Sequence, residues 1–143
     1  MKKRISAFLF LFPSFFFVVS CDMKSGDGII EDNVQAFALA YYNWDFPAAA
    51  KFATDDSQMW LRYLASQVDT SDISAIREKE AAAEVEILSL DLNGNENGNV
   101  TVVVRNYLAM DSIGKIPVCR DADTVTIEII MGKINCNSIT YKR

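Results

Sequence analysis

The stretch EVEILSLDL, residues 84–92, marks the point where the chain changes from helical to strand periodicity. Polar and apolar residues alternate from Glu84 to Ile87. The alternation then continues on the opposite parity with Leu88, Leu90 and Leu92. Since successive side chains of a strand point to opposite faces of a sheet, this pattern predicts a strand, and the change of parity predicts a β-bulge near residues 87–88.

Three further strands are predicted downstream of this stretch. A turn at residues 93–98 leads into a strand over 99–110. The next strand ends at Met131, and its earliest start is Ile116, with an interruption at Pro117. A two-residue turn at Gly132-Lys133 then leads into a last strand over 134–141. The residues expected to face inward on the middle two strands are Val100, Val102, Val104, Val125, Ile127, Ile129 and Met131.

Upstream, the apolar spacing is helical. A first helix is expected from near Ile29, and Asp45 can cap a short second helix, Phe46 to Ala53. The polar cluster 54–57 opens a third helix, and a short fourth helix is expected within 73–82. The apolar face predicted for the first helix is Ile30, Val34, Phe37, Tyr41 and Trp44, and that for the third is Trp60, Leu64 and Val68, with Leu61 beside them. Helices followed by an antiparallel meander predict an α+β fold, with the N-terminal helices on one face of a curved four-stranded sheet.

The first 20 residues have the features of a signal peptide. Lys2, Lys3 and Arg4 precede an apolar run that ends at Val19. This run is shorter than the roughly 20 residues that a spanning helix needs, and it contains Pro13. The sequence therefore predicts an exported protein.

The end of the apolar run resembles the lipobox of bacterial lipoproteins, because Val18-Val19-Ser20 directly precedes Cys21. The resemblance implies cleavage before Cys21, lipidation of its thiol and anchoring to the cell envelope, with the outer membrane as the expected location. The predicted organisation is a signal peptide over 1–20, a lipidated cysteine and flexible tether over 21–28, and one α+β domain over 29–143. The alternative is an ordinary cleaved signal followed by an incidental cysteine.

The composition excludes several kinds of chemistry. The chain contains no histidine, which removes Ser-His-Asp and Cys-His catalysis and imidazole metal sites. All 19 acidic residues lie after the leader, and the acidity argues against nucleic acid as a partner. The acidic residues Asp111, Asp121, Asp123 and Glu128 lack the spacing of a calcium loop, so no metal is expected, and no cofactor either.

A wider resemblance follows from the order of the elements and from the segment Tyr42-Asn43-Trp44-Asp45-Phe46-Pro47-Ala48-Ala49-Ala50. Over residues 29–142 the chain resembles small Gram-negative lipoproteins of unknown function in the nuclear transport factor 2-like superfamily. That resemblance implies a cone, in which helices close a bent sheet around a cavity. The superfamily includes isomerases and dehydratases, but no catalytic residue can be carried over to a position of this chain.

Aromatic residues are the candidates for a ligand pocket. Large rings give apolar walls with polar tips, and they could line a pocket here. Their helical spacing favours the alternative, a core between the helices and the sheet. The residues considered for the pocket lining are Tyr41, Trp44, Trp60 and Tyr63.

The two remaining cysteines, Cys119 and Cys136, could form a disulfide in an exported protein. They have no C-x-x-C spacing, so a structural role is expected rather than redox catalysis. Counted across the predicted hairpin turn, Cys136 should lie opposite Ile129 and face the core.

These observations predict a lipid-anchored envelope protein with a non-catalytic domain that binds a small ligand or a protein. One alternative is an accessory subunit or homodimer that docks through the outer sheet face, where Val103, Tyr107 and Ile130 are apolar. The other alternative is a small isomerase or hydrolase that uses a Tyr/Asp pair inside the cone.

Overall fold

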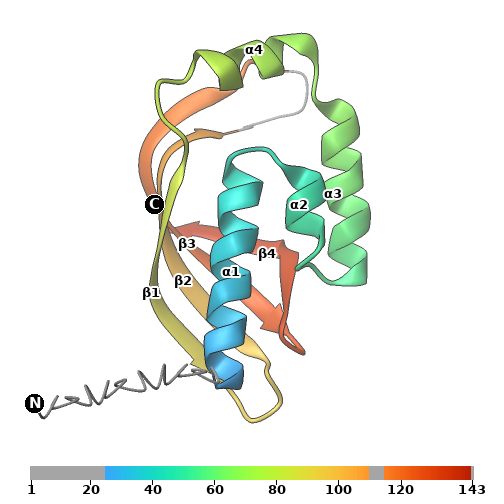
Figure 1. Cartoon of the computed structure of the whole chain (residues 1–143), viewed down its shortest axis with the longest axis vertical. Helices are drawn as coiled ribbons and strands as arrows, with labels where there is room; N and C mark the ends of the chain where they lie inside the picture. Colours follow the sequence, from blue (N-terminus) through green and yellow to red (C-terminus); the bar gives the residue numbers. More distant parts are fainter. Residues whose placement is uncertain (1–24, 110–114, 143) are drawn as a thin grey trace, which may run out of the picture.

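The computed structural model describes residues 25–109 and 115–142 and contains, in that part of the chain, four helices and one four-stranded antiparallel sheet with the strand order β1-β2-β3-β4 (Figure 1). The elements are α1 (Gly26–Tyr42), α2 (Phe46–Ala50), α3 (Asp55–Gln67), α4 (Thr70–Glu78), β1 (Glu84–Leu92), β2 (Gly98–Ala109), β3 (Val118–Ile130) and β4 (Lys133–Lys142). This confirms the α+β class, with the helices before the strands.

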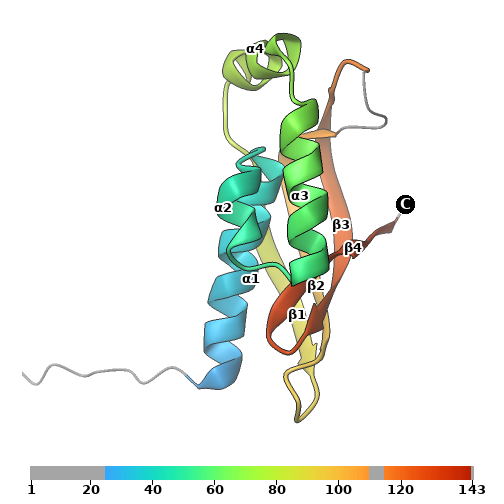
Figure 2. The same cartoon turned by 90° about the vertical axis from the view of Figure 1, so that its right-hand side faces the viewer.

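The helices and the sheet form two layers, and the helices lie on one side of a curved sheet (Figure 2). Helix α1 packs against β1, β2 and β4, while α3 packs against α2 and β4. Between the layers lies a core of buried apolar side chains, which we call the packed region. Its central members are Ile30, Val34, Phe37, Val100, Val102, Val104, Val125, Ile127, Ile129 and Ile134.

Helix α1 begins three residues earlier than predicted. The amide of Ile29 donates to the carbonyl of Ser25 at 3.2 Å, so Gly26 to Gly28 already belong to the helix rather than to a tether. Asp27 in the first turn suits the positive end of the helix dipole. Residues 21–24 of the predicted tether, with Cys21 among them, lie outside the described residues.

Side-chain caps begin the next three helices. The Asp45 carboxylate accepts from the amide of Ala48 at 3.2 Å, and Thr54 Oγ1 accepts from the amide of Ser57 at 3.4 Å. Asp69 and Asp72 form a reciprocal capping box, with bonds of 2.9 and 3.0 Å. These caps confirm the predicted interruptions between the helices. Helix α2 ends at Ala50 rather than at the predicted Ala53, and α4 spans Thr70–Glu78 rather than lying within 73–82.

The buried face of α3 differs from the prediction. Its buried residues are Ser57, Leu61 and Leu64, whereas Trp60 is exposed. The Ser57 hydroxyl lies against β4, where it accepts from the amide of Cys136 at 2.8 Å. Because this polar contact fixes the rotation of the helix, the stripe that starts at Ser57 faces the sheet, and Trp60 faces solvent.

The predicted β-bulge is confirmed. Strand β1 pairs with β2 from Glu84, and its register shifts between Ile87 and Ser89, which leaves Leu88 exposed. A second shift, which the sequence pattern did not indicate, lies between β3 and β4, at Thr126 and Glu128.

The last hairpin turn lies one residue earlier than predicted. Ile130 pairs with Lys133, so the two turn residues are Met131 and Gly132, with φ of 50° and 75°. Two positive φ values are typical of a type I′ turn. Met131 is therefore exposed rather than inward, and Ile129 pairs with Ile134 rather than with Cys136.

Strand β2 changes parity at Asn106, which has a φ of 52°. Val104 is buried before this residue, and Tyr107 and Leu108 are buried after it, although the pairing with β3 keeps its register. A single residue in the left-handed backbone conformation turns the side chains that follow it to the other face of the sheet, and no extra residue is needed in the strand. Tyr107 was predicted on the outer face of the sheet and is instead buried on the inner one.

Candidate functional site

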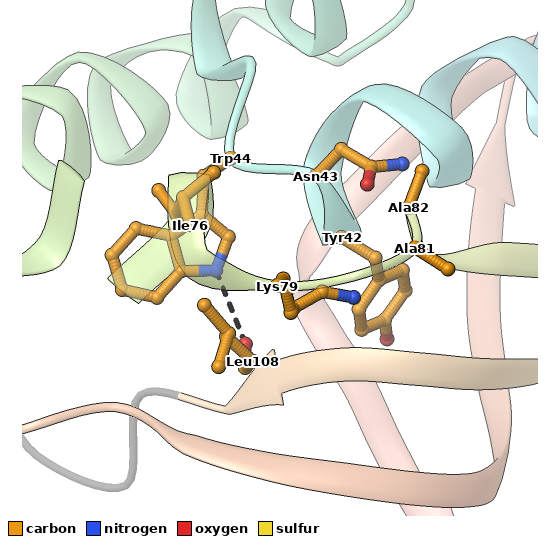
Figure 3. Close-up of a pocket in the computed structure, with 8 residues that line it drawn as sticks. All are labelled: Tyr42, Asn43, Trp44, Ile76, Lys79, Ala81, Ala82 and Leu108. Atoms are coloured by element: carbon orange, nitrogen blue, oxygen red, sulfur yellow. Dashed lines mark hydrogen bonds between the residues drawn. The ribbon is translucent and has the colours of Figure 1, made fainter. Parts of the chain in front are cut away.

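A half-open pocket of about 380 Å³ lies where the C-terminal end of α1 meets the linker after α4 and the end of β2 (Figure 3). A pocket of this size suits a small organic molecule. It is lined by Tyr42, Asn43, Trp44, Ile76, Lys79, Ala81, Ala82 and Leu108.

Trp44 forms one wall of the pocket, and its own backbone is in a strained conformation. Its φ is 63°, which is unusual for a bulky side chain, and the strain persists only where the surroundings hold the residue in place. Its indole Nε1 donates to the carbonyl of Leu108 at 3.1 Å, as Figure 3 shows, and its ring packs on Phe46 with the centroids 6.1 Å apart. Next to it, the amide of Asp45 donates to the carbonyl of Ala40 at 2.8 Å and closes the tight turn after α1.

Asn43 ties the end of α1 to the linker that leads into β1. Its Nδ2 donates to the carbonyls of Leu39 at 2.8 Å and Ala83 at 3.3 Å, and its Oδ1 accepts from the amide of Ala83 at 2.8 Å. The amide group therefore serves the architecture of the pocket wall.

Asn106 holds the opposite side of the same linker. Its Nδ2 donates to the carbonyls of Ala81 at 3.0 Å and Ala82 at 3.4 Å, and its backbone carbonyl accepts from Lys79 Nζ. Asparagine tolerates the left-handed conformation better than most residues, so this position combines a backbone role with side-chain contacts. Lys79 is thus the cation of the lining, and its head group is fixed at the pocket.

Tyr42, which lines the pocket, also belongs to a cluster of tyrosines on the side away from the pocket's other lining residues. The hydroxyls of Tyr42 and Tyr141 are 3.3 Å apart, and the rings of Tyr42 and Tyr107 meet edge to face with centroids 5.0 Å apart. The Tyr107 hydroxyl donates to Asp123 Oδ2 at 2.6 Å, so a Tyr/Asp pair does occur on the inner side of the sheet.

The electrostatics keep these phenols protonated. Burial raises the pKa of Tyr42 well above its ordinary value, and the neighbouring hydroxyl of Tyr141 adds to the effect through its charge and its hydrogen bond. Burial also raises the pKa of Tyr107, with a further contribution from its hydrogen bond to Asp123. A general acid or base works best with a pKa near the working pH, and the raised pKa of each phenol moves it away from neutral pH.

Of the four aromatic residues considered for a pocket lining, Trp44 lines the pocket described here. Tyr41 is half-buried and packs on Phe37 and Phe46, with ring centroids 5.6 and 5.8 Å apart, so it belongs to the core. Trp60 and Tyr63 lie on the outer face of α3, are exposed, and have ring centroids 5.5 Å apart.

Cys119 and Cys136 are free thiols in the structure, so the disulfide considered from the sequence is not formed. Cys119 is exposed on β3, and Cys136 is buried on β4 next to the bulge opposite Thr126–Glu128. Thr126 lies seven positions after Cys119 on β3, roughly 23 Å along the strand, whereas a disulfide needs Cα atoms within about 7 Å. As predicted, Cys136 faces the core, where burial raises the pKa of its thiol to about 11.

Several pocket residues were not predicted from the sequence. The lining roles of Tyr42, Asn43 and Lys79, and the supporting role of Asn106, follow from contacts between segments far apart in the chain. No sequence pattern marks the irregularity at Asn106, because apolar residues stand at both parities around it, with Val103 at an odd position before it and Leu108 at an even position after it.

In residues 25–109 and 115–142, no group of three or more cysteine, aspartate or glutamate side chains is placed to hold a metal ion. None of the helices in these ranges is long and apolar enough to cross a membrane. Comparison with protein-family models, with curated proteins and with solved structures found no match to the chain.

Proposed function

We propose that this protein is a lipid-anchored component of the bacterial cell envelope whose α+β domain binds a small molecule in the pocket beside Trp44, without catalysing a reaction on it. We include in this proposal that the two layers form a nuclear transport factor 2-like cone. The observation that carries it is the strained Trp44 backbone beside an apolar pocket, because such strain is found preferentially at functional sites.

The anchor is supported by the leader and by Cys21 directly after it. Cells supplied with a labelled fatty acid should label the protein, and Cys21→Ala should abolish the label and either release the protein or leave the precursor uncleaved. A mature form without label in the wild type would contradict the anchor.

Binding is favoured over catalysis because the pocket walls are aromatic and aliphatic and the nearby phenols hold their protons. The enzyme alternative has one specific observation in its favour, the short bond from Tyr107 to Asp123. Neither residue lines the pocket, however, and Tyr107 is buried. Docking through the outer sheet face has weaker support than the sequence pattern indicated, since Tyr107 is not on that face.

The binding proposal can be tested with N-phenyl-1-naphthylamine, a neutral aromatic probe that becomes fluorescent in apolar surroundings. We expect saturable binding to residues 22–143, which Ala82→Trp should block because Ala82 is an exposed lining residue with room for the added ring. The matched control is Ser74→Trp, which adds the same bulk on the exposed side of α4, outside the lining. Equal binding by the two variants would contradict the pocket as the site.

A further inference from the structure

The polar groups around the pocket are not equally available to a ligand. The amide of Asn43 is used by three hydrogen bonds to the backbone, and the Trp44 indole N–H is used by the carbonyl of Leu108. The remaining lining residues other than Lys79 are Tyr42, Ile76, Ala81, Ala82 and Leu108. The Tyr42 hydroxyl lies within hydrogen-bond distance of Tyr141. Lys79 is therefore the polar lining group with the most unused bonding capacity.

The ammonium group of Lys79 has donors to spare. It carries three N–H groups, and the carbonyl of Asn106 accepts one of them. Lys79 is half-buried, and among the described residues no carboxylate forms an ion pair with it. The neighbouring Glu78 and Glu80 are exposed and do not line the pocket.

A partly buried cation that has no counter-ion within residues 25–109 and 115–142, at the edge of an apolar pocket, favours an anionic ligand. Partial removal from water strengthens the attraction for an anion, and a charge-assisted hydrogen bond is stronger than a neutral one. The Asn106 carbonyl holds the ammonium in place, so little side-chain entropy remains to be lost when a ligand binds.

We infer that the ligand is a small amphipathic anion, with one carboxylate or sulfonate group at Lys79 and an aromatic or aliphatic body against Trp44, Ile76 and Leu108. This inference rests on the proposed function and names the class of ligand for the same pocket. A single anionic group fits better than a phosphate dianion, because one lysine supplies the positive charge and the chain as a whole carries a net charge of −5.

The test compares two probes that share one aromatic framework. N-phenyl-1-naphthylamine is neutral, and 8-anilino-1-naphthalenesulfonate is the same framework with one added sulfonate. Each is titrated into folded residues 22–143, and near-UV circular dichroism verifies the native state of every variant. We expect the sulfonate to bind about tenfold more tightly than the neutral probe, since a hydrogen bond to a charged group corresponds to about that factor.

Two variants then test whether the preference for the sulfonate over the neutral probe depends on the Lys79 side chain. Lys79→Gln should remove most of the tenfold preference for the sulfonate, so that the ratio of the two dissociation constants falls towards one. Lys51→Gln is the matched control, because Lys51 is exposed and lies outside the lining, and it should retain the preference.

Each outcome separates this inference from the proposed function. If the neutral probe binds but the sulfonate binds no more tightly, or if Lys79→Gln retains the preference, the anionic class is wrong and the pocket proposal stands. If neither probe binds to the wild-type protein, both proposals fail.

Discussion

The packed region and the pocket end of the molecule are held together in different ways. In the packed region, Phe37 of α1, Val102 of β2 and Ile127 of β3 are completely buried, and the two strand residues follow the regular alternation of their strands. At the pocket end, Trp44 and Asn106 have positive φ values, and side chains bind backbone carbonyls of other segments. Apolar packing between the two layers holds the packed region together, whereas polar contacts between segments far apart in the chain hold the pocket end.

The largest expected effect on stability comes from a substitution in the packed region. Phe37→Ala removes a large, fully buried side chain and should lower the free energy of unfolding by about 4 kcal/mol. The measurement is a urea denaturation series, with Phe37→Leu as the control, for which we expect a loss of about 1 kcal/mol. A loss under about 1 kcal/mol for the alanine variant would show that this region is less tightly packed than its burial indicates.

Substitution of Trp44 tests whether the pocket end stores backbone strain. Trp44→Ala should cost about 2 kcal/mol, less than a core aromatic residue, because the side chain is half-buried and makes one hydrogen bond. Trp44→Gly should cost about 1 kcal/mol less than that, since glycine adopts the left-handed conformation without strain. If the glycine variant is the less stable of the two, the strain at this position is not significant.

The tyrosine cluster at the border of the two regions should make stability depend on alkaline pH. Burial raises the pKa of Tyr42 far above 10.0, so below pH 10 the phenol is protonated in both the folded and the unfolded state. Above that pH the unfolded phenol loses its proton while the folded one keeps it, and the free energy of unfolding should fall by about 1.4 kcal/mol per pH unit for each such tyrosine.

Urea midpoints measured between neutral pH and about pH 11 would give this slope. Tyr42→Phe should make it shallower by about 1.4 kcal/mol per pH unit. An unchanged slope in that variant would mean that Tyr42 ionises equally readily in both states.

The smallest expected effect concerns an ion pair on the sheet surface. Arg105 Nη1 and Glu86 Oε2 are 2.9 Å apart, but their side chains are 44% and 56% exposed. A double-mutant cycle with alanine should give a coupling free energy of about 0.5 kcal/mol or less, which should decrease further in about 1 M salt. A coupling above about 1 kcal/mol would give this surface pair a larger part in stability than solvent screening predicts.

The sequence was most informative where one local pattern dominates. The bulge at Ile87–Ser89, the caps at Asp45 and Thr54 and the inward stripe of β2 were all predicted, because alternation and capping depend on neighbouring residues. The errors lie at Trp60, Met131 and Tyr107, where one residue of rotation or one positive φ decides which way a side chain points.

By itself the sequence determined the α+β class, the order of the elements and the candidate residues on which the anchor proposal rests, since periodicity, caps and leader composition are local properties. Only the tertiary structure decided that Trp44 forms a pocket wall while Trp60 and Tyr63 face solvent. It also brought Lys79 to Asn106, across 27 residues of chain. The pocket depends on contacts between segments that share no sequence pattern, and those contacts form only when the helices pack on the curved sheet.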